Sequence, residues 1–209
     1  MRIDVFADIA CPWCYIGEKR LEQALAQRPD LHAEVRWHPF QLQPDLPRPG
    51  EDWHDFVESK FGGEQRAERA FESVRRAAQG EGIDFRFDRM AAAPNTEDAH
   101  RLVLLAAEKG REWEVVTALF KAHFTEGRHV GDLDTLVEIA AGEGLDPSEV
   151  RSYLESEQGT AEVRASQATA GRLGINGVPF FIFDGRYAIS GAQPPEVFLE
   201  ALDEAAKAA

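Results

Sequence analysis

The sequence has few cysteines, no long apolar run and a shortage of positive charge. No stretch of the 209 residues approaches the roughly 18 consecutive apolar residues that a transmembrane helix needs. The first residues also lack the basic start and apolar run of a secretory signal, so we expect a cytoplasmic protein. Lys and Arg number 23 against 37 Asp and Glu, and the formal charge of −14 would repel nucleic acid and anionic lipid. We expect neither as a partner.

The two cysteines, Cys11 and Cys14, both lie in one Cys-Pro-Trp-Cys tetrapeptide. Two cysteines cannot build a disulfide framework, and the six histidines show no paired spacing that would complete a four-ligand zinc site. No metal site is therefore predicted. The spacing favours a redox dithiol over two ordinary buried thiols or half of a metal site shared between subunits.

The first fifty residues predict a β-α-β unit. Residues 2–8 alternate as a strand does, a helical pattern begins at Pro12 and ends near residues 28–30, and residues 33–38 alternate again. Four of the eleven prolines follow within residues 39–49, so a boundary is expected near residue 50.

The middle of the chain predicts helices and the end returns to strands. A β-rich run at 178–183, a turn at Asp184-Gly185, a return strand at 186–189 and a helix opened by Pro194-Pro195 close the chain. The segment 83–87 is predicted as extended or irregular. The expected organisation is an α/β core, residues 1–48 and 175–209, with a helical domain, residues 49–174, inserted in its middle. Helical apolar spacing recurs in seven segments: 51–61, 64–79, 96–109, 111–125, 132–142, 147–156 and 159–172.

The position of the tetrapeptide gives its two thiols unequal roles. Cys11 lies at the strand-to-helix junction, where free backbone N–H groups and the positive end of the helix dipole stabilise a thiolate, the nucleophilic form. Cys14 is one helical turn further on, close enough to attack a mixed disulfide formed at Cys11, and it shares the apolar face of Leu21 and Leu25. We therefore expect Cys11 to attack and the more buried Cys14 to resolve.

Two segments resemble the DsbA-like branch of the thioredoxin superfamily, and most of all its FrnE-type oxidoreductases. They are DIACPWCYIGEKRLEQAL after the first strand and GINGVPFFIFDGRYAISGAQPPEVFLEAL near the end. The resemblance covers nearly the whole chain and implies a thioredoxin-like fold with an all-helical domain between the second and third strands. It also implies that Pro179, preceded by Val178, is cis and faces the dithiol.

Several further residues are candidates for substrate binding. A cis bond at Pro179 would leave the backbone of Val178 free to pair with an extended substrate. Pro12 and Trp13 offer an apolar contact beside the sulfur. Trp13 replaces the histidine of the best-known periplasmic relatives, so we expect a less stabilised thiolate and a less oxidising disulfide. Phe40 and Asn95 resemble segments that border the active site in related folds.

Asp8 precedes the dithiol by three residues. The sequence favours a solvated carboxylate at the end of a strand, although a buried Asp8 would be a proton acceptor for Cys14.

Three functions remain open from the sequence. The leading one is a thiol-disulfide oxidoreductase or isomerase acting on protein or small-molecule thiols, with no cofactor beyond the Cys11–Cys14 disulfide and with glutathione or thioredoxin as electron partner. The second is a glutathione-dependent isomerase or transferase similar to 2-hydroxychromene-2-carboxylate isomerases and kappa-class glutathione transferases, with glutathione as cosubstrate. Those relatives generally do not keep both cysteines, so Cys14 favours the first. The third is a redox-switched binding protein or chaperone.

Overall fold

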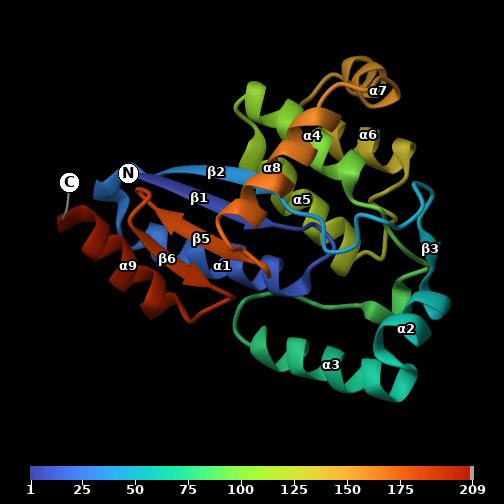
Figure 1. The fold of residues 1–209 in the computed structure, drawn as a ribbon, viewed down its shortest axis with the longest axis horizontal. Coiled ribbons are helices and arrows are strands. Elements are labelled where there is room, and N and C mark those ends of the chain that lie inside the picture. Colours follow the sequence, from blue (N-terminus) through green and yellow to red (C-terminus); the bar gives the residue numbers. More distant parts are fainter. Residues whose placement is uncertain (208–209) are drawn as a thin grey trace.

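The computed structural model describes residues 1–207. A four-stranded mixed sheet forms the centre of the protein (Figure 1). The strand order is β2-β1-β5-β6; β1 is parallel to β2 and antiparallel to β5, and β6 is antiparallel to β5. The connection from β1 to β2 is the predicted β-α-β unit. The strands are β1 (Arg2–Ala7), β2 (Glu34–Pro39), β5 (Phe180–Phe183) and β6 (Tyr187–Ser190).

Helices cover both faces of this sheet. On one face, Phe181 of β5 packs edge-on against Phe198 of α9 (Pro195–Lys207) and closely approaches Gly17 of α1 (Pro12–Ala26). On the other face, Phe6 packs with Ala170 of α8 (Thr160–Arg172). Both sides of β1 are therefore buried, which explains the one departure from its alternation, the apolar Phe6 on the face of Asp4.

The inserted region is helical, and all seven predicted helices are present with ends within a few residues of the expected ones. Their starts follow capping chemistry: the side chain of Asp132 accepts a hydrogen bond from the backbone N–H of Thr135, and Asp146 does the same for Glu149. Besides α8, these helices are α2 (Trp53–Phe61), α3 (Glu64–Ala77), α4 (Glu97–Glu108), α5 (Glu112–Phe124), α6 (Leu133–Gly142) and α7 (Pro147–Glu155).

Short elements inside this region were not predicted. β3 (Glu51–Asp52) pairs antiparallel with β4 (Ala92–Ala93), and a single 3-10 turn occupies Phe87–Arg89 beside the segment 83–87, which forms no strand. Two-residue strands carry no periodicity from which a sequence could reveal them.

The helices of the insertion lie in two groups (Figure 1). α2 and α3 form an arm on one side of the molecule, whereas α4 to α7 gather on another. One continuous apolar core nevertheless joins Ile3 and Ile16 around the sheet to Phe120 and Leu136 in the helices. Within residues 1–207, none of the helices is long and apolar enough to cross a membrane.

Candidate active site

The dithiol lies where β1 gives way to α1. Cys11 is the N-cap of α1, with an extended backbone, and Pro12 occupies the first helical position. The N–H of Cys14 donates to the carbonyl of Cys11 at 3.0 Å, so the two thiols share the first turn. Neither cysteine is in a disulfide, and both side chains are buried, that of Cys11 at 4% exposure and that of Cys14 at 1%. The positive end of the helix dipole favours negative charge at this end of the helix.

The environment of Cys14 keeps its thiol protonated. Burial, followed by the hydrogen bond and charge of the adjacent Cys11 sulfur, raises the pKa of Cys14 well above its usual value. A thiol of raised pKa is a poor first nucleophile. The geometry is thus consistent with attack by Cys11 and later resolution by Cys14.

The Val178–Pro179 peptide bond is cis, as the resemblance implied. The Cys11 thiol donates to the carbonyl oxygen of Val178 at 3.7 Å, so this loop lies against the dithiol. Gly17 makes the close packing possible, because a Cβ at that position would come within 3.0 Å of the rings of Pro179 and Phe181.

Asp8 is buried rather than solvated, so that expectation was wrong. Its side chain is covered by the loop that follows β2: one carboxylate oxygen accepts the backbone N–H of Leu42 at 2.7 Å. The other lies 3.3 Å from Nε2 of His100, a fully buried residue of α4. A strand-end aspartate became a core residue because α4 and this loop fold over it.

The charge of Asp8 is stabilised in this position. Burial alone would raise the pKa of Asp8, but the interaction with His100, assisted by the N–H of Leu42, outweighs burial and holds the pKa below its usual value. Asp8 is therefore a carboxylate at neutral pH. It lies near enough to Cys14 to affect the pKa of that thiol.

A cavity of about 250 Å³ opens beside the dithiol. Cys11, Pro12 and Trp13 line it on one side, and aromatic side chains from the helical insertion line the other. Trp13 is one of the few large apolar side chains that remain exposed, at 37%. A larger cavity, of about 980 Å³, runs along β2 and is lined by neither cysteine.

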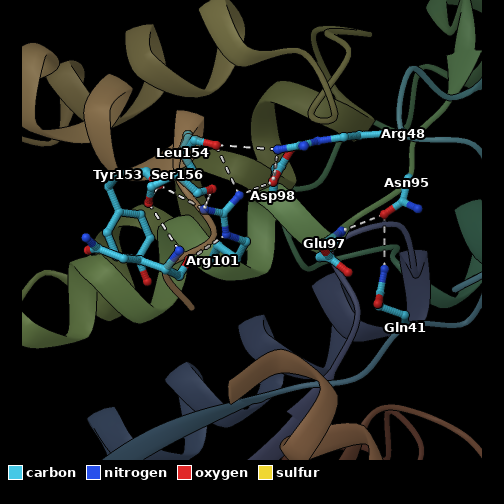
Figure 2. Close-up of polar contacts among 10 residues, drawn as sticks. Gln41, Arg48, Asn95, Glu97, Asp98, Arg101, Tyr153, Leu154 and Ser156 are labelled. Atoms are coloured by element: carbon cyan, nitrogen blue, oxygen red, sulfur yellow. Dashed lines mark hydrogen bonds and ion pairs between the residues drawn. The ribbon is translucent and has the colours of Figure 1, made fainter. Parts of the chain in front are cut away.

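The remaining predicted substrate residues lie outside the small cavity. Phe40 packs in the core on the α8 face of the sheet. Asn95 is committed to structure: its side chain donates to the carbonyl of Leu46 at 2.7 Å and accepts from the backbone N–H of Glu97 at 2.9 Å. Figure 2 shows Asn95 between Glu97 and Gln41, whose amide also donates to it. Asn95 thus joins the post-β2 loop to the start of α4.

Sequence reasoning missed the aromatic wall of the cavity. Its residues on α2 and α3 lie among charged residues, so their helical periodicity predicts ordinary core positions. A high density of aromatic residues between 53 and 87 was the one signal in the sequence. Within residues 1–207, no cluster of His, Cys, Asp or Glu side chains is arranged to hold a metal ion.

These features define a thioredoxin-like protein with an inserted helical region and a CxxC dithiol. The profile of the DSBA-like thioredoxin domain matches residues 2–203, and the chain belongs to that family. Family membership supports an oxidoreductase or isomerase type of enzyme.

Three known proteins illustrate the similarity. A crystal structure of a probable DsbA oxidoreductase from Streptomyces coelicolor is 38% identical, with a TM-score of 0.89 over 99% of this chain and 90% of that one. The uncharacterized protein YwbO of Bacillus subtilis is 28% identical over 99% of this chain and 98% of its own length. A 2-hydroxychromene-2-carboxylate isomerase structure shares the fold, with a TM-score of 0.76 and 19% identity over 100% of this chain and 97% of that one.

Proposed function

We propose that this protein catalyses thiol-disulfide exchange, with Cys11 as the nucleophile and Cys14 as the resolving thiol. The observation that carries the proposal is the inequality of the two thiols. Cys11 caps the helix and lines a cavity, whereas Cys14 is more deeply buried and its pKa is raised. This difference supports the proposed order of attack.

The reaction balances as a two-electron exchange. The Cys11 thiolate attacks one sulfur of a substrate disulfide, forms a mixed disulfide and expels the other sulfur as a thiolate. Cys14 then loses its proton and attacks Cys11, which forms the Cys11–Cys14 disulfide and releases the second thiol. The substrate gains two electrons and the dithiol loses them. The reverse sequence oxidises a substrate dithiol.

Asp8 is the group that would take the proton from Cys14. Burial raises the pKa of Cys14 throughout, and as long as Cys11 carries a free thiol, two further effects of that thiol, its hydrogen bond and its charge, oppose ionisation of Cys14. A mixed disulfide on Cys11 removes both effects, and Asp8, already ionised, is the adjacent base. The pKa of Cys14 thus falls once Cys11 has reacted, which favours resolution after attack.

The electron partner and the compartment belong to the same proposal. The Cys11–Cys14 disulfide is the redox centre, and glutathione or thioredoxin would restore its starting state. A reducing cytoplasm suits a transient catalytic disulfide, so we propose that compartment. Cell fractionation tests it, and a periplasmic or extracellular pool would contradict it.

Trapping of mixed disulfides tests the proposed function directly. Cys14→Ser should accumulate mixed disulfides through Cys11, because the resolving thiol is gone, whereas Cys11→Ser should form none and should lower exchange to the uncatalysed rate. Non-reducing electrophoresis and mass spectrometry measure the adducts. Adducts on Cys14 in the Cys11→Ser variant, or full glutathione-dependent isomerase turnover by Cys14→Ser, would overturn the assignment.

A further inference from the structure

The cavity beside Cys11 carries information about the substrate, and the inference drawn from it rests on the proposed function. Cys11 is only 4% exposed, and its side chain lines this cavity. A disulfide sulfur must contact the Cys11 sulfur in order to react. The shape and chemistry of the cavity therefore select which groups can be attached to that disulfide.

The far wall of the cavity is aromatic. The rings of Trp53 and Phe71 stack at a centroid separation of 6.0 Å, and Phe71 stacks on Phe87 at 4.2 Å. These rings are already held by one another, so a further ring can pack against them without reorganising the wall. The aromatic residues of the insertion that line the cavity are Trp53, Phe56, Phe61, Phe71, Phe87 and Phe124.

Few charges face this space. Among the described residues that line it, Asp8 is the one acid, and its carboxylate is engaged by Leu42 and His100. Burial lowers the pKa of the lining residue His123 to about 4, so its ring is neutral at physiological pH. Lys60 is the one lining cation; it is exposed, and its ammonium group lies over the ring of Phe56.

We propose that this cavity binds one compact aromatic group of a low-molecular-weight disulfide or thiol and presents its sulfur to Cys11. The size agrees with this occupant. An apolar cavity of about 150 Å³ holds benzene. The 250 Å³ available here therefore accommodates a single substituted aromatic ring.

Glutathione fits this space poorly. It carries two carboxylates and an ammonium group, and burying charges among apolar walls without partners is costly. The one lysine at the cavity cannot pair both carboxylates. A glutathione moiety would therefore bind outside the cavity.

The bounded shape of the cavity also favours a small molecule over a protein substrate. Leu42 and Leu46 of the post-β2 loop line the cavity together with residues of α2 and α3. A peptide would have to carry its flanking residues past these walls to bring a disulfide to a sulfur that is 4% exposed. A small diaryl disulfide has no flanking residues.

The exchange can be followed in a single turnover. The reduced protein reacts with 4,4′-dithiodipyridine to give the Cys11–Cys14 disulfide and two molecules of 4-thiopyridone, which absorb light, so no further reductant is required. Oxidised glutathione is the comparison substrate. Rates for both disulfides are divided by their rates with free dithiothreitol, which removes the difference in intrinsic reactivity.

Two variants of α3 separate cavity binding from general effects. Ala70 lines the cavity, whereas Ala77, two turns further along the same helix, does not; both are half-buried. Ala70→Phe should slow the normalised reaction with 4,4′-dithiodipyridine at least tenfold and leave that with oxidised glutathione within twofold. Ala77→Phe should leave both within twofold.

Three outcomes would overturn the proposal. Equal slowing of both disulfides by Ala70→Phe would assign the cavity a structural role, and no slowing would make it irrelevant to substrate. A normalised rate for a phenylalanine-containing peptide disulfide above that for 4,4′-dithiodipyridine, equally sensitive to Ala70→Phe, would assign the cavity to a protein side chain.

A redox-inert ligand distinguishes failure of this inference from failure of the proposed function. Trp13 and Trp53 both line the cavity, so binding of 4-methylpyridine should change tryptophan fluorescence, and it should do so in Cys11→Ser as well as in the wild type. If 4-methylpyridine binds but the wild-type protein catalyses no thiol-disulfide exchange, the proposed function is wrong and the proposal for the cavity stands. If the protein catalyses exchange but does not bind 4-methylpyridine, and Ala70→Phe behaves as the wild type, the proposal for the cavity is wrong and the proposed function stands.

Discussion

Two consecutive residues of α4, His100 and Arg101, are both buried and point to opposite parts of the molecule. His100, at 0% exposure, reaches Asp8 behind the dithiol. Arg101, at 1% exposure, reaches the connection between α7 and α8 (Figure 2). The same helix therefore supports two buried polar clusters with different surroundings.

The Arg101 cluster is fully hydrogen-bonded. Its guanidinium donates to the carboxylate of Asp98 at 2.6 Å, and Arg48 donates to the same carboxylate from the surface. Such complete pairing removes the penalty of burying a charge and fixes one geometry. The other acceptors of Arg101 are the carbonyls of Tyr153, Leu154, Ser156 and Gln158.

The His100 cluster is incomplete. Both ring nitrogens of His100 lack a well-directed hydrogen bond, although Nε2 lies 3.3 Å from Asp8, and Nδ1 of the nearby His123 has no partner. Buried polar groups left unpaired are uncommon and mark places where something other than stability has shaped the structure. The Arg101 side thus joins α4 to the α7–α8 connection, whereas the His100 side lies against Asp8 next to the dithiol.

Arg101→Met gives the largest expected effect on stability. It leaves Asp98 and the four carbonyls without their buried donor, which should lower the free energy of unfolding by about 4 kcal/mol. Urea denaturation measures this loss. The exchange rate of the folded fraction should not change, and Arg101→Lys, which keeps the charge but fewer donors, should lose about half as much. A slower exchange rate in folded Arg101→Met would contradict the prediction that the Arg101 cluster affects stability alone.

Acid should destabilise the dithiol side through His123. Unfolded, this histidine binds a proton near pH 6.5, but burial lowers its folded pKa to about 4, so the unfolded state binds more protons between these values. Its contribution is complete above pH 6.5 and is lost as pH falls to 4, on the order of 3 kcal/mol. His123→Phe should flatten the stability curve in this window. Urea denaturation at several pH values between 4 and 7 measures the curve, and an equally steep loss in His123→Phe would contradict the prediction.

Asp8→Asn should slow resolution about a hundredfold, equivalent to about 2.7 kcal/mol of activation free energy. Asparagine can still accept the N–H of Leu42, but it cannot take the proton of Cys14. Quenched-flow measurement of the Cys11 mixed disulfide gives the rate. In the variant this rate should rise with pH wherever the wild-type rate is level, because hydroxide replaces the carboxylate.

Asp98→Asn is the matched control for Asp8→Asn, because it alters the acid of the other cluster. It should reduce stability and leave the lifetime of the mixed disulfide unchanged. Equal lifetimes for wild type and Asp8→Asn at every pH would remove Asp8 from the mechanism.

Glu112 gives the smallest expected effect and tests whether a half-buried acid with a raised pKa always marks a catalytic site. It lies on α5, accepts the N–H of Trp37 at 3.2 Å, and burial raises its pKa to about 7. The folded state thus holds a proton that the unfolded state releases near pH 4.5, and stability falls as pH rises toward 7. Glu112→Gln should add about 1 kcal/mol at pH 8 and little at pH 5, with unchanged exchange. Thermal unfolding at both values measures it, and stabilisation at pH 5 alone would contradict the sign.

The secondary structure could be predicted well because its causes are local. Each helix of the insertion has its own apolar face, and Asp132 and Asp146 mark two of the starts as N-caps. The strand-to-helix junction at Cys11 follows from alternation, then Pro12, then helical spacing. The β3–β4 pair could not be predicted, because strands of two residues are too short to show an alternating pattern.

Distant contacts of the site could not be predicted in the same way. Asp8 is buried by His100 and Leu42, which lie on other elements, and nothing within its own segment specifies either contact. The binding role of Asn95 stays a prediction drawn from resemblance, and the hydrogen bonds that join its side chain to Leu46 and the start of α4 could not be foreseen from its own segment. The cavity requires α2, α3 and α5 to meet in front of Cys11.

By itself the sequence determined the elements and the dithiol: a CxxC at the start of a helix, strands before and after it, and a helical insertion. These features depend on neighbours within a few residues, through backbone geometry, capping and periodic burial. Only the tertiary structure decided that Asp8 is a buried carboxylate, that His100 and Arg101 serve different clusters, and that aromatic rings face Cys11. Burial and ionisation are set by whichever groups fold into contact, and those contacts join residues that are far apart in the chain.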